Sequence, residues 1–169
     1  MDLKRFNNLN ERERRDALSN CCGATHWVDK MLTSAPVEKL ELLLELSDKN
    51  WYDCTESDWL EAFTHHPKIG DLKSLENKFA LTKEMAGNEQ SGINVATENV
   101  LIELADYNKR YEDKFGYIFI VCATGKSANE MLELLKSRIN NSPEEEIKIA
   151  MEEQNKITKL RLEKFLTEN

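Results

Sequence analysis

The sequence predicts an all-α protein, with a single compact helical domain over residues 1–169 and one short extended segment at about residues 117–123. Three observations support this prediction. Apolar side chains recur every three or four positions along most of the chain, which is the period of a helix. Several of these stretches begin after a residue that caps helices and end at glycine or before proline. The chain is also long enough to bury a hydrophobic core.

The first predicted helix is marked by its N-cap. Asn10 precedes a helical stretch from Glu11 to about Cys22, and Glu13 follows three residues later, as in a capping box. We expect Gly23 to end this helix. A second helix is predicted around Trp27–Leu32, where apolar residues fall on one face.

Two more helices are predicted before a less regular region. Pro36 is expected near the start of a third helix. This helix carries apolar and small residues at helical spacing: Leu40, Leu43, Leu44 and Ser47. Ser57 is the predicted N-cap of a fourth helix, which contains Trp59, Leu60 and Phe63. The stretch 67–92 has weak periodicity, so we expect loops and short turns there, and such loops often carry function.

The C-terminal half returns to helical periodicity. The stretch 95–114 has one apolar stripe, made of Val100, Leu101, Leu104, Tyr107, Tyr111 and Phe115. Residues 117–123 are the only strand-like run, and without a partner strand they are expected to be a buried extended segment whose backbone can meet a ligand. Ser127 is expected to cap a helix to about Ile139, and Ser142-Pro143 to open a last long helix.

Composition excludes several classes of partner. The net charge of −8 gives no overall attraction for nucleic acid. No apolar run approaches the roughly 20 residues of a membrane span, and no targeting signal is recognised, so we expect a cytoplasmic protein. The four cysteines are Cys21, Cys22, Cys54 and Cys122, and none makes a C-x-x-C pair. The adjacent Cys21 and Cys22 are expected to be buried reduced thiols rather than a bridge.

His66 is the strongest candidate for proton transfer among the three histidines. Pro67 disfavours helical geometry at His66, so the preceding helix is expected to stop there. An imidazole at a helix end, beside a glycine-containing loop, is well placed to face a pocket, and its pKa suits proton transfer near neutral pH. The alternative is a histidine that caps helix carbonyl groups, and the residues alone leave both interpretations open.

Two other charged residues are candidates for a site. Arg161 and Gln154 project from the middle of the apolar face of the last helix, which is formed by Ile147, Ala150, Ile157 and Phe165. An arginine there needs a partner, either a structural carboxylate or a bound anion. Glu89 lies between glycines that allow close backbone approach, but a solvated surface carboxylate is the simpler interpretation.

The sequence lacks the motifs that are typical of several kinds of catalytic or binding site. Gly70, Gly87 and Gly92 lack the spacing of a phosphate-binding loop. No zinc or calcium motif and no G-x-S-x-G nucleophile elbow occurs. We therefore predict no metal site.

Motifs along nearly the whole chain carry a resemblance to a known family. They are Cys21-Cys22-Gly23-Ala24 with Trp27 and Met31, His66-Pro67-Lys68-Ile69-Gly70-Asp71, Glu89-Gln90-Ser91-Gly92, Asn108 with Tyr111-Glu112 and Phe115-Gly116-Tyr117, the run from Phe119 to Ser127, and Glu153-Gln154 through Lys156-Ile157 to Leu160-Arg161-Leu162. In this order they resemble the 2-oxo-4-hydroxy-4-carboxy-5-ureidoimidazoline (OHCU) decarboxylases, which act late in urate degradation. The histidine motif and the segment around Cys122 together are specific.

The resemblance implies a set of site residues. The catalytic residues would be His66, Glu89 and Arg161. Substrate contacts would come from Pro67, Ala86, Gln90, Val121, Cys122, Ala123, Thr124 and Gly125. Many relatives have serine at the position of Ala86, so only backbone contacts are expected there.

The resemblance also implies an activity and an assembly. It implies an all-α homodimer that removes the substrate carboxylate as carbon dioxide and yields (S)-allantoin, without metal or organic cofactor. His66 would be the general acid or base, Glu89 would bind ureido or ring N–H groups, and Arg161 would hold an oxygen of the substrate.

Two other classes of function compete with this interpretation. One is a catalytically impaired helical binding module of the same fold, which the change at Ala86 favours and the joint presence of His66, Glu89 and Arg161 opposes. The other is a hydrolase of urate degradation, which predicts a metal or an activated nucleophile that the sequence lacks.

Overall fold

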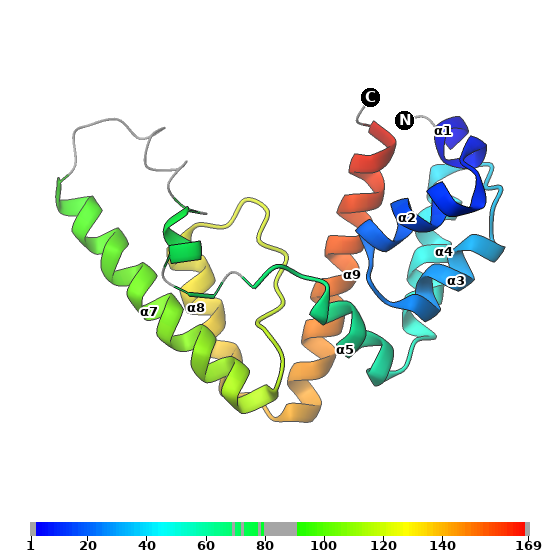
Figure 1. Cartoon of the computed structure of the whole chain (residues 1–169). Coiled ribbons are helices and arrows are strands. Elements are labelled where there is room, and N and C mark those ends of the chain that lie inside the picture. Colours follow the sequence, from blue (N-terminus) through cyan, green and yellow to red (C-terminus); the bar gives the residue numbers. More distant parts are fainter. Residues whose placement is uncertain (1–2, 69, 72, 78, 80–90, 168–169) are drawn as a thin grey trace. The chain divides into compact units, whose positions relative to one another are not determined.

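The computed structural model describes residues 3–68, 70–71, 73–77, 79 and 91–167. All regular elements in these ranges are α-helices (Figure 1), which confirms the all-α prediction. The helices belong to two compact units. The first unit holds the chain up to His66, the segment Ile120–Cys122 and the chain from Ile147 onward; the second holds Pro67–Phe119 and Ala123–Glu146.

The first unit is built from the N-terminal helices and most of the last helix. Its helices are α1 (Leu3–Asn8), α2 (Glu11–Cys21), α3 (Thr25–Thr33), α4 (Leu40–Tyr52), α5 (Glu56–Thr64) and the part of α9 (Pro143–Thr167) from Ile147 onward. Helix α3 is central because it contacts α2, α4 and α5. One hydrophobic core joins these helices, and Met151, Leu162 and Leu166 of α9 belong to it.

Two buried tryptophans connect the elements of this unit through their indole N–H groups. Trp27 donates to the carbonyl oxygen of Ser47 at 3.1 Å, and Trp51 donates to that of Met151 at 3.0 Å. Both side chains are fully buried. Because a buried indole N–H needs an acceptor, these bonds fix α3 to α4 and α4 to α9.

The structure confirms one predicted cap and corrects two details. Asn10 accepts from the backbone N–H of Glu13 at 2.9 Å, and Glu13 completes the predicted capping box. The N-cap of α5 is Thr55 rather than Ser57, because Asp58, three residues after Thr55, closes a capping box with it. Helix α4 begins only at Leu40, so Pro36 lies in the preceding connection and not in the first turn.

The second unit contains α7 (Ser91–Phe115) and α8 (Ala128–Arg138), which pack against each other, together with a helical turn at 73–77. Ser127 caps α8 through a capping box, as predicted. After α7 the chain turns at Gly116, whose φ of 80° favours glycine. Residues 118–123 then form neither helix nor strand, since the described part of the chain offers this run no strand with which to pair.

A buried charged cluster holds the second unit together where α9 begins. The carboxylate of Glu146 is fully buried and accepts from Arg138 Nε at 2.8 Å, from Asn141 Nδ2 at 2.9 Å and from the hydroxyl of Tyr111. The Arg138 guanidinium also lies 4.4 Å from the ring centroid of Phe119. These contacts satisfy a carboxylate that would otherwise be costly to bury.

Cys21 and Cys22 are buried free thiols, as predicted. All four lack a disulfide, and Cys21, Cys22 and Cys54 are buried. Burial raises the pKa of Cys21 and Cys54 to about 12 and that of Cys22 to about 11. These three thiols therefore stay protonated near neutral pH and are poor nucleophiles.

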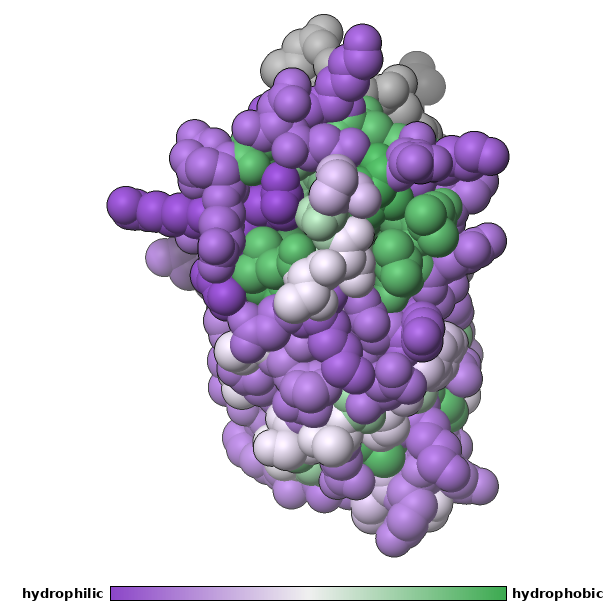
Figure 2. All heavy atoms as spheres, turned by 90° about the vertical axis from the view of Figure 1, so that its right-hand side faces the viewer, coloured by the Kyte–Doolittle hydropathy of each residue, from purple (hydrophilic) through white to green (hydrophobic). Residues whose placement is uncertain are grey.

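The surface is mainly hydrophilic on the face that Figure 2 shows, where hydrophobic atoms lie between polar ones. Within the described ranges, no helix has both the length and the hydropathy of a membrane span. The same residues contain no group of three His, Cys, Asp or Glu side chains placed to hold a metal ion.

Candidate active site

His66 lies just beyond the end of α5, as the proline rule predicted. The helix ends at Thr64, and His65 is its C-cap. The backbone N–H of His66 still donates to the carbonyl oxygen of Phe63 at 3.3 Å, so the histidine is held to the last turn. The residue lies outside the helix, and it is half-buried.

The ring of His66 is fixed by an amide from the last helix. Nε2 of His66 lies 2.5 Å from Oε1 of Gln154, which is fully buried. The amide nitrogen of Gln154 in turn donates to the hydroxyl oxygen of Thr158 at 3.2 Å, one turn further along α9. The amide is thus held at both ends, with its oxygen toward the histidine.

The surroundings of His66 favour its neutral form. Burial is the largest influence and lowers the pKa of His66 below its ordinary value of 6.5. The hydrogen bond to Gln154 acts in the opposite direction, whereas the positive charge of Arg161 and the neighbouring His65 lower the pKa further. A neutral imidazole near pH 7 can accept a proton at one nitrogen and donate from the other.

His65 has a different environment, although it is next in sequence. Its ring lies against the backbone of Gly23, so close that a Cβ atom at residue 23 would be 2.2 Å from Cγ and 2.5 Å from Cβ of His65. The sequence predicted that Gly23 ends the preceding helix, and α2 does end at Cys21. Gly23 has no positive φ, unlike Gly116 and Gly125, so a left-handed backbone does not explain the glycine. Close packing against His65 is the reason for glycine at this position.

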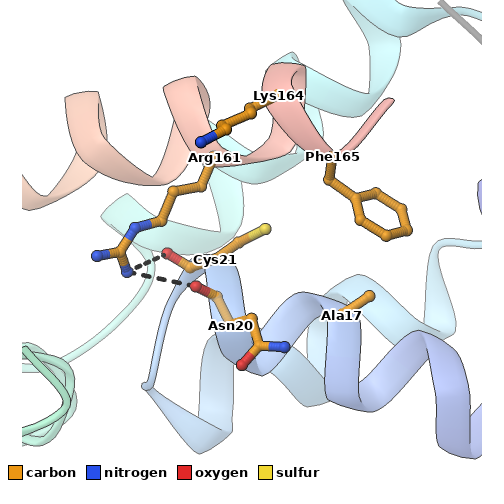
Figure 3. Close-up of a pocket in the computed structure, with 6 residues that line it drawn as sticks. All are labelled: Ala17, Asn20, Cys21, Arg161, Lys164 and Phe165. Atoms are coloured by element: carbon orange, nitrogen blue, oxygen red, sulfur yellow. Dashed lines mark hydrogen bonds between the residues drawn. The ribbon is translucent and has the colours of Figure 1, made fainter. Parts of the chain in front are cut away.

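Arg161 lies in the first unit and lines an open hollow of about 380 Å³ (Figure 3). The hollow is lined by Ala17, Asn20, Cys21, Arg161, Lys164 and Phe165. Nη1 of Arg161 donates to the carbonyl oxygens of Asn20 at 3.3 Å and Cys21 at 3.5 Å, at the end of α2. In the described part of the chain neither a carboxylate partner nor an acceptor for Nε and Nη2 is found, so these donors are available for an anion.

The segment around Cys122 is anchored to α9 by Glu153. The backbone N–H of Cys122 donates to Oε2 of Glu153 at 2.7 Å, and Lys156 lies 2.5 Å from the other carboxylate oxygen. The sequence predicted that backbone groups of this segment would read the substrate. The N–H of Cys122 is already used within the protein, so it is not one of the groups that a substrate would find open.

The predicted site residues are divided between the two units. His66, Arg161, Val121 and Cys122 belong to the first unit, whereas Pro67 and Ala123, Thr124 and Gly125 belong to the second. Glu89, Ala86 and Gln90 lie outside the described residues.

No role for Glu153 or Gln154 was predicted from the sequence. In the structure, Glu153 binds the backbone of Cys122 and Gln154 binds the ring of His66. Gln154 stood in the middle of an apolar helix face, and a buried amide in such a place needs hydrogen-bond partners. The position of Gln154 on the apolar face could therefore have indicated a buried hydrogen bond. It could not show which partners the amide has, because the histidine lies 88 residues away in sequence.

Comparisons with known proteins agree with this fold. The family model described as OHCU decarboxylase matches residues 7–163. The uric acid degradation bifunctional protein TTL of Arabidopsis thaliana is 36% identical over 148 residues, which are 88% of this chain and 46% of that protein. The OHCU decarboxylase of Amia calva is 28% identical over 170 residues, 98% of this chain and 95% of that protein.

A solved structure adds a comparison in three dimensions. A crystal structure of OHCU decarboxylase in the presence of (S)-allantoin is 36% identical, with a TM-score of 0.71, and the match covers 90% of this chain and 99% of that one. This chain spans less than half the length of the bifunctional relatives it matches. The shared class is an all-helical protein. The chain belongs to the OHCU decarboxylase family.

Proposed function

We propose that this protein converts OHCU to (S)-allantoin and carbon dioxide in urate degradation. The observation that carries the proposal is the placement of a half-buried, oriented His66 and an arginine with open donors in one unit of a chain that belongs to this family. The presence of (S)-allantoin with the 36% identical relative supports the choice of product.

The chemistry of the substrate explains why few protein groups are needed. Loss of carbon dioxide leaves an electron pair at the ring carbon, and the adjacent conjugated ring can accept it. A cofactor is then not required as an electron sink, and we propose that the enzyme uses neither metal nor organic cofactor. The protein must orient the carboxylate, control charge and deliver a proton to one face of the ring.

Each of three residues has a proposed role. His66 is the general acid or base, because its lowered pKa keeps a proton-accepting nitrogen available near neutral pH. Arg161 holds an anionic or carbonyl oxygen of the substrate through its open guanidinium donors. Glu89 binds ureido or ring N–H groups, as the family resemblance implies.

Further contacts are proposed from the family pattern. Pro67, Gln90 and the backbone of Ala86 would line the substrate. Backbone groups of Val121, Cys122, Ala123, Thr124 and Gly125 would bind the ring amides, apart from the N–H of Cys122, which Glu153 occupies.

The organisation of the protein is part of the proposal. Because the family model spans residues 7–163, we propose that both units make one decarboxylase domain over residues 1–169. We also propose a homodimer, which analytical ultracentrifugation would test, and a cytoplasmic location, which buried thiols without disulfides favour. Cell fractionation with a tagged chain would test the location.

The test of function must separate catalysis from spontaneous decay. OHCU decays without enzyme to racemic allantoin, so OHCU generated in situ should lose its ultraviolet signal faster with the protein and give optically pure (S)-allantoin by circular dichroism. Racemic allantoin formed at the uncatalysed rate would contradict the proposal. That result would instead favour the impaired binding module of the same fold.

A further inference from the structure

We propose that Gln154 is a positioning residue that sets the tautomer of His66, so that Nε2 carries the proton and Nδ1 faces the substrate with its lone pair. The inference rests on the proposed function of His66 and makes it more specific. It assigns which nitrogen reacts and in which protonation state the histidine meets the substrate.

The argument begins with the direction of the amide. Gln154 Nε2 donates to the hydroxyl oxygen of Thr158 at 3.2 Å, and that hydroxyl donates to the backbone carbonyl of Gln154 at 3.0 Å. With its hydrogen used in this way, the Thr158 hydroxyl is an acceptor for the amide. The amide oxygen therefore points at His66.

The direction of the amide decides the state of the ring. An amide oxygen only accepts hydrogen bonds, so a bond with His66 Nε2 at 2.5 Å requires a proton on that nitrogen. In neutral histidine the lone pair is then on Nδ1. No described residue hydrogen-bonds Nδ1, so this nitrogen is open to a ligand.

Burial makes this hydrogen bond decisive. Gln154 is fully buried, so no water competes for its oxygen. The other neutral tautomer, with its proton on Nδ1, would place the lone pair of Nε2 against the amide oxygen and leave a buried acceptor unsatisfied. As Nδ1 takes a proton from the substrate, the ring becomes an imidazolium whose Nε2–H is still held by Gln154, and the positive charge shifts toward an acceptor already in place. The proton leaves again from Nδ1, so the enzyme ends unchanged.

The direct test is the tautomer itself, read from ¹⁵N chemical shifts of labelled histidine at a pH above the His66 transition. The three histidines can be assigned with His26→Gln and His65→Gln variants. We expect His66 to be almost entirely the Nε2–H form in the wild type and a mixture in Gln154→Leu. A wild-type ring with its proton on Nδ1, or the same tautomer population in Gln154→Leu, would overturn the inference.

Kinetics give a second readout with a matched control. Asn155 is a buried amide on the same helix, but it donates to Asp48 and not to His66. We expect Gln154→Leu to lower kcat by about 10–100-fold with little change in KM, and Asn155→Leu to leave kcat near the wild type. An equal loss of kcat in the two variants would contradict the inference, because Gln154 would then have only a structural role.

The pH profile separates positioning from folding. Arg161 and His65 face His66 in every variant and lower its pKa, whereas Gln154 raises it. Gln154→Leu should move the acid limb of kcat/KM to lower pH, and Gln154→Glu, which keeps an acceptor, should restore part of kcat and move the limb to higher pH. An acid limb that stays in place in both variants would overturn the inference. If instead His66→Ala keeps its activity while the tautomer results hold, only the proposed function of His66 fails.

Discussion

Replacing Gly23 with alanine tests how tightly His65, and with it His66, is held in the first unit. The added Cβ would lie 2.2 Å from Cγ, 2.5 Å from Cβ and 2.7 Å from Cδ2 of His65. Rotation about the side-chain bonds can move Cγ and Cδ2, but Cβ is fixed to the backbone, so a change of rotamer alone cannot remove the overlap. The backbone of α5 beyond Thr64 has to move, and His66 moves with it.

Two effects of opposite sign determine the magnitude. The φ of Gly23 is not positive, so alanine fits the backbone and would by itself stabilise the protein by about 0.4–1 kcal/mol through the unfolded state. Overpacking of a close contact costs about 1–3 kcal/mol. Because the overlap includes Cβ of His65, which is fixed to the backbone, we expect overpacking to outweigh this gain, with a net loss of about 1–2 kcal/mol.

Urea unfolding followed by circular dichroism would measure this loss as a lower midpoint at an unchanged slope. His65→Gly in the Gly23→Ala background removes the overlapping atoms and should recover most of the loss relative to His65→Gly alone. We also expect kcat to fall in Gly23→Ala and to rise again in the double variant. A midpoint equal to or above that of the wild type would refute the reasoning about close packing.

Other predictions concern charge and thiol reactivity. Glu146→Ala leaves the buried Arg138 without its carboxylate, so it should lower the free energy of unfolding by about 3–5 kcal/mol, and Glu146→Gln by less, in the same urea assay. A decrease of less than about 1 kcal/mol in the free energy of unfolding of Glu146→Ala would contradict the stabilising role of this buried cluster. Since the pKa of His66 in the folded protein is below 6.5, kcat/KM should stay constant until the pH falls below that value. The free energy of unfolding should also decrease as the pH falls below 6.5, because the unfolded chain then binds this proton more readily than the folded protein. An acid limb above pH 6.5 would contradict this. A thiol reagent at pH 7.5 should modify Cys122 before the three buried cysteines, whose pKa values lie near 11 to 12. Mass spectrometry of peptides would follow the modification of each cysteine, and equal rates at all four would contradict this prediction.

Local signals predicted the helices well. The capping boxes at Asn10 and Ser127 and the proline after His66 depend on neighbours within a few residues, so sequence spacing alone locates them. Ser57 was a wrong choice because two candidate caps stand two residues apart, and only the pairing of Thr55 with Asp58 distinguishes them.

Long-range contacts were beyond the reach of spacing. Glu146 is one of three acidic residues in the first turn of α9, but its burial depends on Arg138 and Tyr111 from other helices. Likewise, Gly23 was explained by its own helix, whereas its reason is the ring of His65 far along the chain. The site residues followed from the family resemblance, and their roles stay predictions.

The central claim is that His66, and not its neighbour His65, transfers the proton that makes the product optically pure. The most direct measurement compares wild-type protein, His66→Ala and His65→Ala, each shown to be folded, for the rate and the circular dichroism of allantoin formed from OHCU. We predict (S)-allantoin from the wild type and, at a reduced rate, from His65→Ala, and racemic allantoin at the spontaneous rate from His66→Ala. Optically pure (S)-allantoin formed by His66→Ala at nearly the wild-type rate would contradict the account.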